Sequence, residues 1–130
     1  GGTAGTLMGI AKALKKAMSS CKVFAVEPSS SPILSKGVKG SHNVEGVGLG
    51  FVPNIYDEKL VDNVIAIDET EAREICKDLA KKEGIFCGTS SGMNVAAAIH
   101  ISKELGPKSK VVTVACDTGL KYLSEGLFDD

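Results

Sequence analysis

Residues 1–9 read GGTAGTLMG, and residues 10–28, IAKALKKAMSSCKVFAVEP, follow them with a helical and then a strand pattern. The small residues of the opening stretch leave backbone N–H groups accessible, and a helix directly behind adds unpaired N–H groups and the positive end of its dipole. Such a loop is typical of an anion site, most often for phosphate. Taken alone, it is equally the pattern of a flexible start or of a glycine remnant from expression.

The segment behind this loop predicts a helix and a strand. Apolar residues recur every three or four positions over residues 7–17, which is typical of an amphipathic helix. Its buried stripe would hold Leu7, Ile10, Leu14 and Ala17, and its solvent face Lys12, Lys15 and Lys16. Lys22–Pro28 is a short β-rich run that ends at proline. A helix of this length between strands favours a right-handed crossover, so we expect an earlier parallel strand before Gly1.

A glycine-rich segment follows a short helix that we expect from Pro32 through Ser35. This segment, Gly37–Gly50, lacks periodicity and has glycine at every second position near its end. Such spacing lets a ligand or another backbone approach closely. Because long ordered loops in compact domains are often binding loops, we favour a binding role over a plain surface loop.

The middle of the chain predicts a second strand and helix. Asp62–Ile67 has a strand pattern, and Asp68 is placed to cap a helix, with Glu71 three residues further on. The buried stripe of this helix would hold Ala72, Ile75, Cys76, Leu79 and Ala80, before a C-cap at Gly84. The segment therefore continues the alternation of strand and helix.

Polar turns follow short apolar runs in the last third of the chain. Gly88–Gly92 comes after Ile85–Cys87, and we expect a helix over residues 93–105. Lys110–Cys116 is almost unbroken in apolar residues, which predicts a central parallel strand buried on both faces. Asp117–Gly119 would then lie at the carboxyl end of that strand, where open α/β sheets bind ligands.

These elements predict an α/β fold with a mainly parallel, twisted sheet flanked by helices. Residues 1–130 are expected to form a single partial domain, because their number suits one domain and the strand expected before Gly1 is missing from it. The opening loop, Gly88–Gly92 and Asp117–Gly119 are expected to converge on one ligand at the carboxyl edge of the sheet.

Charge and cysteine content argue against several classes of protein. The net charge of −1 offers no basic field for nucleic acid or anionic membrane, and no apolar run is long enough to span a bilayer. The four cysteines, Cys21, Cys76, Cys87 and Cys116, form no C-x-x-C pair, so no metal site is expected. We expect Cys76 and Cys116 to be buried thiols in a reducing, cytoplasmic compartment, while an organellar address upstream of Gly1 stays open.

Several short motifs resemble, in order, those of the cysteine synthase (O-acetylserine sulfhydrylase) family of fold type II pyridoxal-phosphate enzymes. The family's Gly-Thr-Gly-Gly-Thr phosphate loop is matched by Gly2–Thr6, and its Val-Glu-Pro by Val26–Pro28. Its Gly-Ile-Gly-Ala-Gly-Phe loop is matched by Gly46–Phe51, its Gly-Ile-Ser-Ser-Gly segment by Gly88–Gly92, and its Tyr-Leu-Ser by Tyr122–Ser124. The resemblance covers essentially the whole chain. It implies the C-terminal half of such an enzyme, comprising most of the large domain and truncated at the N-terminus.

The resemblance also implies roles for the matching residues. The cofactor phosphate would be held by Gly2, Thr3, Ala4, Gly5 and Thr6, of which Ala4 departs from the family's glycine. Ser90 would hydrogen-bond the pyridine nitrogen, with Asp117 and Thr118 near the ring. Gly46, Val47 and Gly48 would lie beside the substrate. A neutral hydroxyl at the ring nitrogen suits β-elimination and replacement better than transamination.

The implied reaction makes cysteine from O-acetylserine and sulfide, in proteins that are usually homodimers. In this family, the lysine that binds the cofactor and transfers the substrate proton lies in the N-terminal half. No lysine of this chain has that context, so we expect the catalytic lysine upstream of Gly1 and no catalytic residue within the chain. The chain alone is therefore expected to be inactive.

Other functions remain open on the sequence. A cystathionine β-synthase shares the phosphate loop and the serine, and serine/threonine dehydratases are more distant relatives. A non-catalytic fragment or scaffold domain is a different class, which residues upstream of Gly1 would distinguish. A nucleotide binder of Rossmann type would need an acidic residue at the end of the second strand to hold a ribose, and Glu27 has that position.

Overall fold

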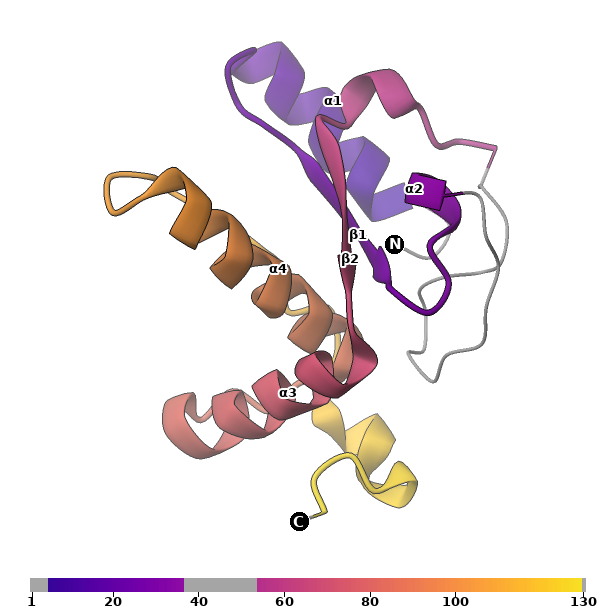
Figure 1. The fold of residues 1–130 in the computed structure, drawn as a ribbon, viewed down its shortest axis with the longest axis vertical. Helices are drawn as coiled ribbons and strands as arrows, with labels where there is room; N and C mark the ends of the chain where they lie inside the picture. Colours follow the sequence, from indigo (N-terminus) through magenta and orange to yellow (C-terminus); the bar gives the residue numbers. More distant parts are fainter. Residues whose placement is uncertain (1–4, 37–53, 130) are drawn as a thin grey trace.

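The computed structural model describes residues 5–36 and 54–129 (Figure 1). The elements in chain order are α1 (Gly5–Ala17), β1 (Phe24–Pro28), α2 (Ile33–Lys36), η1 (Glu58–Leu60), β2 (Asn63–Ile67), α3 (Glu69–Glu83), α4 (Thr89–Leu105) and η2 (Gly119–Glu125), where η marks a 3-10 helix. The predicted binding residues Gly2, Thr3, Ala4, Gly46, Val47 and Gly48 lie outside the described residues. The fold is α/β, as predicted.

β1 and β2 form a parallel pair at the centre of the molecule. The register runs from Phe24 opposite Asn63 to Pro28 opposite Ile67, and the N–H of Ser29 extends it by donating to Ile67 O at 2.9 Å. α1 and α4 both run antiparallel to these strands, so that both helices begin near the ends of the strands (Figure 1). Within the described residues the sheet has two strands.

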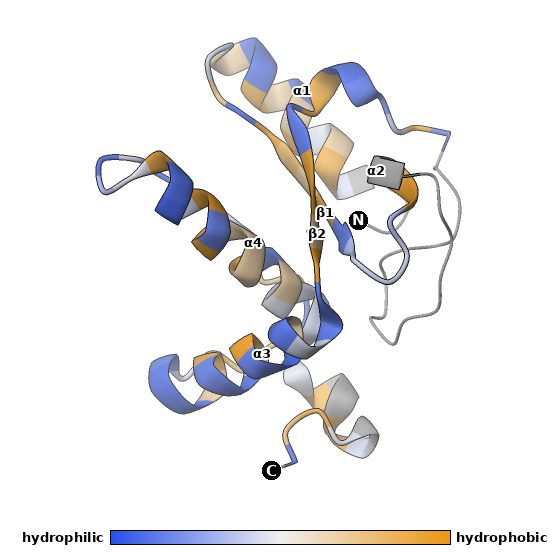
Figure 2. Ribbon diagram, in the orientation of Figure 1, coloured by the Kyte–Doolittle hydropathy of each residue, from blue (hydrophilic) through white to orange (hydrophobic). Residues whose placement is uncertain are grey.

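The main core lies between the sheet and α4. Ile67, Ala72, Met93, Ala96 and Ala97 form one buried cluster, against which Val26, Ile65 and Ile75 pack. Figure 2 shows that β1 and β2 consist largely of hydrophobic residues, whereas α3 is largely hydrophilic. The small side chains of Ala96 and Ala97 let α4 approach the sheet closely.

α1 confirms the predicted helix, but the predicted buried stripe is wrong. Met8 and Ala11 are 3% and 0% exposed, whereas Ile10 and Leu14 are 40% and 38% exposed. Apolar residues occupy most positions of this helix, so periodicity fits more than one face. We assigned Lys15 to the solvent face, but its side chain reaches the sheet. This contact determines which face of α1 is buried.

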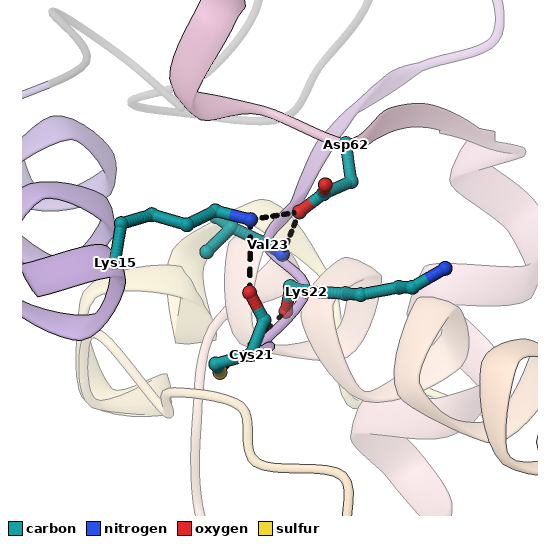
Figure 3. A network of polar contacts seen from close by, with 5 residues as sticks. All are labelled: Lys15, Cys21, Lys22, Val23 and Asp62. Atoms are coloured by element: carbon teal, nitrogen blue, oxygen red, sulfur yellow. Dashed lines mark hydrogen bonds and ion pairs between the residues drawn. The ribbon is translucent and has the colours of Figure 1, made fainter. Parts of the chain in front are cut away.

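Lys15 ties α1 to the start of both strands (Figure 3). Its Nζ lies 2.7 Å from Asp62 Oδ2 and donates to Cys21 O at 2.9 Å. The N–H of Val23 donates to the same carboxylate oxygen at 2.7 Å. These hydrogen bonds, from Lys15 first, lower the pKa of Asp62. The contacts lie at the amino ends of the strands and orient α1 against the sheet.

α3 confirms its predicted caps. Asp68 Oδ1 accepts from the N–H of Thr70 at 2.8 Å, and Gly84 ends the helix in the left-handed region, at φ 66°. Ala72 and Cys76 are fully buried, as predicted. Glu71 does not close a capping box in the described contacts, because its Oε1 lies 2.6 Å from His100 Nε2 on α4.

α3 and α4 approach closely at Gly92. A Cβ at this position would collide with the backbone oxygen of Ala72 and lie 2.6 Å from Cys76 Sγ. Glycine is therefore required in the first turn of α4, where it permits contact between the backbones of the two helices.

The predicted strand at Lys110–Cys116 is wrong: the segment belongs to no strand in the described residues. Val112 is 92% exposed, and Cys116, which we expected to be buried, is exposed as well. A strand buried on both faces needs neighbouring strands and two covering layers, whereas Val114 and Cys116 of this segment are hydrogen-bonded to Asn94 and Ser91 of α4. Asn94 Nδ2 donates to Val114 O at 3.0 Å.

Candidate functional site

α4 begins four residues earlier than predicted, so that Gly88–Gly92 is the start of this helix and not a separate turn. Gly88 is the N-cap residue, and its lack of a side chain leaves the helix start without a local side-chain cap. Thr89, Ser90 and Ser91 form the first turn and are 2%, 9% and 0% exposed. The serine-rich start of α4 is therefore buried.

The carboxyl edge of the sheet brings two helix starts to the same side of the molecule. α1 and α4 both begin at this edge, close to the ends of β1 and β2 (Figure 1). The positive dipole ends of both helices therefore lie at the edge where open α/β sheets bind ligands. Gly5 and Thr6 belong to the first turn of α1.

Asp117 supplies the cap that α4 lacks. Its Oδ1 accepts from the N–H of Gly88 at 3.2 Å and from the hydroxyl of Ser91 at 3.2 Å. Ser91 Oγ also accepts from the N–H of Cys116 at 2.8 Å. A carboxylate at a helix N-terminus is favourable both as a hydrogen-bond acceptor and as a charge. Two of the turns predicted to converge, Gly88–Gly92 and Asp117–Gly119, therefore do meet.

Ser90 and Thr89 keep free hydroxyls beside this network. Neither hydroxyl has a hydrogen-bond partner within residues 5–36 and 54–129. In the same part of the chain, every fully enclosed side-chain oxygen has a partner. Both hydroxyls therefore reach solvent-accessible space, although the residues are almost completely buried. Ser90 thus offers one hydrogen-bonding group to a ligand at the start of α4.

Thr118 has a local structural role. Its Oγ1 accepts from the N–H of Leu120 at 3.4 Å and caps η2, and its backbone pairs with Cys87 in an antiparallel bridge. The next residue, Gly119, has no room for a side chain, because a Cβ would lie 2.7 Å from the rings of Phe86 and Phe128. The structure therefore anchors the segment after Asp117 against Phe86 and Cys87.

The side chain of Glu27 is not placed to hold a ribose. It is 3% exposed, and its Oε2 accepts from the N–H of Leu34 at 2.9 Å in α2. A ribose ligand needs an accessible carboxylate at the end of the strand. This contact argues against the Rossmann-type alternative.

Two buried thiols lie beneath the start of α4. Cys76 Sγ donates to Gly88 O at 3.1 Å. Burial, with the neighbouring Cys87, raises the pKa of Cys76 to about 12. Burial also raises the pKa of Cys87. Both thiols are therefore neutral at pH 7 and act as packing groups and not as nucleophiles.

The sequence prediction named Ser90 and Asp117 but missed Ser91. The signal was present as a second serine next to Ser90, but a serine pair does not show which hydroxyl turns inward. Within the ranges that the structure covers, no group of three His, Cys, Asp or Glu residues is placed to hold a metal ion. None of the helices described there is long and apolar enough to cross a membrane.

Comparison with known proteins places this arrangement in a family. The sequence model of the family described as pyridoxal-phosphate dependent enzyme matches residues 1–117. The chain belongs to this family. A cysteine synthase from Staphylococcus aureus is 44% identical over 131 residues, which cover 99% of this chain and 42% of that protein.

Solved structures of a cysteine synthase and of a cystathionine β-synthase have the same fold. A cysteine synthase from Entamoeba histolytica matches with a TM-score of 0.93 and 34% identity, over 100% of this chain and 39% of that one. An O-acetylserine dependent cystathionine β-synthase from Helicobacter pylori matches with a TM-score of 0.91 and 35% identity, over 98% of this chain and 41% of that one. The chain thus spans about 40% of the length of these relatives. The predicted family is confirmed.

The described residues fit the cofactor that the family name implies. Ser90 provides a hydroxyl without a partner among residues 5–36 and 54–129, and Asp117 already occupies the acceptor position at the start of α4. A neutral ring atom is a better partner for this helix start than a second anion, because the Asp117 carboxylate would repel a phosphate there. The start of α1, with Gly5 and Thr6, has no such carboxylate in its first turn.

Proposed function

We propose that the protein that carries this chain is a pyridoxal-phosphate-dependent cysteine synthase, which replaces the acetate of O-acetylserine with sulfide. The observation that carries the proposal is the free hydroxyl of Ser90, buried at the start of α4 in a chain that is 44% identical to a cysteine synthase. When bound, pyridoxal phosphate supplies an electron sink for negative charge at the substrate Cα.

The chain's own residues divide the binding of this cofactor between two helix starts. Gly2, Thr3, Ala4, Gly5 and Thr6 would hold the phosphate through backbone N–H groups and the threonine hydroxyls at the start of α1. Ser90 would hold the pyridine nitrogen through a neutral hydroxyl at the start of α4. Because a hydroxyl does not keep that nitrogen protonated as a carboxylate would, the site favours β-replacement over transamination.

Asp117 and Thr118 have supporting roles in the proposed cofactor site. The Asp117 carboxylate accepts hydrogen bonds from Gly88 and Ser91. It would therefore support the ring site by holding the start of α4, and it would not donate a proton to the ring. Thr118 would lie beside it in the segment that ends at η2. Gly46, Val47 and Gly48 would line the substrate side, and the base that moves the substrate proton would be a lysine contributed by the rest of the protein.

The assembly and the compartment follow from the same proposal. We infer a homodimer, because the resemblance implies this assembly, and a cytoplasmic location, because unpaired cysteines fit a reducing compartment. The chain without the lysine-bearing part should bind and orient the cofactor poorly and should form no cysteine.

A cystathionine β-synthase-like activity is the second candidate. The match to an O-acetylserine dependent cystathionine β-synthase at a TM-score of 0.91 supports it. The two functions share the first substrate or its serine analogue and differ in the sulfur nucleophile. The choice between sulfide and homocysteine can depend on residues other than Ser90 and Asp117. These two residues therefore do not distinguish the two functions.

Product analysis separates these candidates. The protein that carries this chain is incubated with pyridoxal phosphate and O-acetylserine, and with either sulfide or homocysteine. Cysteine formed faster than cystathionine supports the proposal, and the reverse order supports the second candidate. The 130-residue chain alone serves as the control, and rapid cysteine formation by it would overturn our assignment of the catalytic lysine to another part of the protein.

A further inference from the structure

The start of α4 is held from both sides of Ser90. Gly88, two residues before it, donates its N–H to Asp117 Oδ1 at 3.2 Å. Ser91, directly after it, donates its hydroxyl to the same oxygen at 3.2 Å and accepts from the N–H of Cys116 at 2.8 Å. Ser90 is thus the residue between two anchors that share one carboxylate.

This arrangement removes the freedom that a helix start usually has. The first turn of a helix has unsatisfied N–H groups and frays easily, which would let a side chain in it adopt several directions. Here the flanking residues are tied to a segment more than twenty residues further along the chain, and Ser91 is 0% exposed. Ser90 is 9% exposed with a free hydroxyl, so the fixed backbone restricts the directions in which it can meet a ligand.

We propose that Ser91 and Asp117 are positioning residues, which fix the first turn of α4 so that the Ser90 hydroxyl is preorganised toward the cofactor ring. The proposal rests on the proposed function, since it takes pyridoxal phosphate as the ligand of Ser90. Preorganisation increases affinity because less conformational freedom is lost when the ligand binds. Because Ser91 is 0% exposed, it would act through Ser90 and not by touching substrate or cofactor.

A double-mutant cycle on cofactor affinity tests this role. The dissociation constant of pyridoxal phosphate is measured by equilibrium dialysis for the protein that carries this chain, and for its Ser90→Ala, Ser91→Ala and doubly substituted forms. Ser91→Ala is expected to weaken binding about threefold to tenfold, the value of one well-placed hydrogen bond. In the Ser90→Ala background, the same change should have almost no effect, because the hydroxyl that it orients is gone.

Control variants separate positioning from folding. Ser102→Ala removes a hydroxyl of the same helix that donates to Ala98 O at 2.7 Å far from the start, and it should leave the affinity unchanged. Ser91→Cys keeps the shape of the side chain but is a weak hydrogen-bonding group, so it should weaken binding even if Ser91→Ala fails to fold.

The outcomes distinguish this inference from the proposed function. Equal losses from Ser91→Ala in both backgrounds would mean a purely structural role and would overturn the inference alone. Unchanged affinity in both Ser91→Ala and Ser91→Cys would do the same. If the unsubstituted protein binds no pyridoxal phosphate, the proposed function fails and the inference fails with it.

Discussion

The carboxylate of Asp117 accepts a hydrogen bond from the N–H of Gly88, 3.2 Å away, and so caps a helix to which it does not belong. Helix caps are usually local, from the residue at the helix start itself. Here the N-cap residue is a glycine, which has no side chain to accept a hydrogen bond, and the carboxylate comes from the residue that follows the 110–116 segment. The relationship links the two turns at the candidate site.

Asp117→Ala should destabilise the fold by about 1–2 kcal/mol, because it leaves the start of α4 uncapped and the buried Ser91 hydroxyl without its acceptor. Asp57→Ala is the matched control. Asp57 Oδ1 accepts from Lys59 N at 3.0 Å and caps the short, exposed η1, so its loss should cost about 0.5 kcal/mol or less. Urea unfolding of both variants measures the difference, and equal costs would argue against the long-range cap.

Gly92→Ala should destabilise the fold by about 1–3 kcal/mol, because the added methyl would collide with the backbone of α3 at Ala72. Gly9→Ala provides the opposite case, since a Cβ at the exposed Gly9 would have no atom of the described residues within 4 Å. That variant should gain about 0.5–1 kcal/mol from the lower backbone entropy of alanine. Thermal unfolding should therefore shift in opposite directions for the same substitution, and a shift in the same direction would contradict the packing.

Asp62 should make a pH-dependent contribution to stability. Because its pKa is lowered from 3.8 in the folded protein, the contribution is present above pH 3.8 and is lost as the pH falls through the folded value. The side chain is 35% exposed, so solvent screening keeps the effect below about 1 kcal/mol. Asp62→Asn should lower the free energy of unfolding at pH 7 and have little effect near pH 2. A difference that stays constant between these two pH values would contradict the assignment.

The four cysteines should divide into reactive and protected thiols. Cys116 is exposed and Cys21 is partly exposed, whereas Cys76 and Cys87 are 0% and 1% exposed. With its pKa raised to about 12, Cys76 has almost no thiolate at pH 8. Alkylation at pH 8 followed by mass spectrometry should label Cys116 first and Cys76 and Cys87 only after denaturation. Early labelling of Cys76 would show that the start of α4 opens readily.

Local signals in the sequence were enough where a few neighbouring residues decide the structure. The caps of α3 at Asp68 and Gly84 were predicted correctly, because each acts within its own turn. The face of α1 was not, because its apolar residues fit two faces and the choice depends on the contact between Lys15 and Asp62, which are 47 residues apart. Long-range pairing of this kind has no periodicity that a single sequence shows.

The location of the site was predictable from the sequence, but the hydrogen bonds within it were not. The convergence of Gly88–Gly92 with Asp117 followed from the expected edge of a parallel sheet, although the strand expected at Lys110–Cys116 is absent from the described structure. An apolar run gives the preference of a segment for a buried strand, but the hydrogen-bonding partners must come from elsewhere. The inward turn of Ser91 likewise depends on contacts across the fold.

The most direct test of the account is the affinity for pyridoxal phosphate of the protein that carries this chain, compared with its Ser90→Ala variant and with Ser102→Ala as the control. We predict that Ser90→Ala weakens binding about tenfold, while Ser102→Ala binds like the unsubstituted protein. An unchanged dissociation constant in Ser90→Ala would contradict the central claim that the buried hydroxyl at the start of α4 holds the cofactor ring.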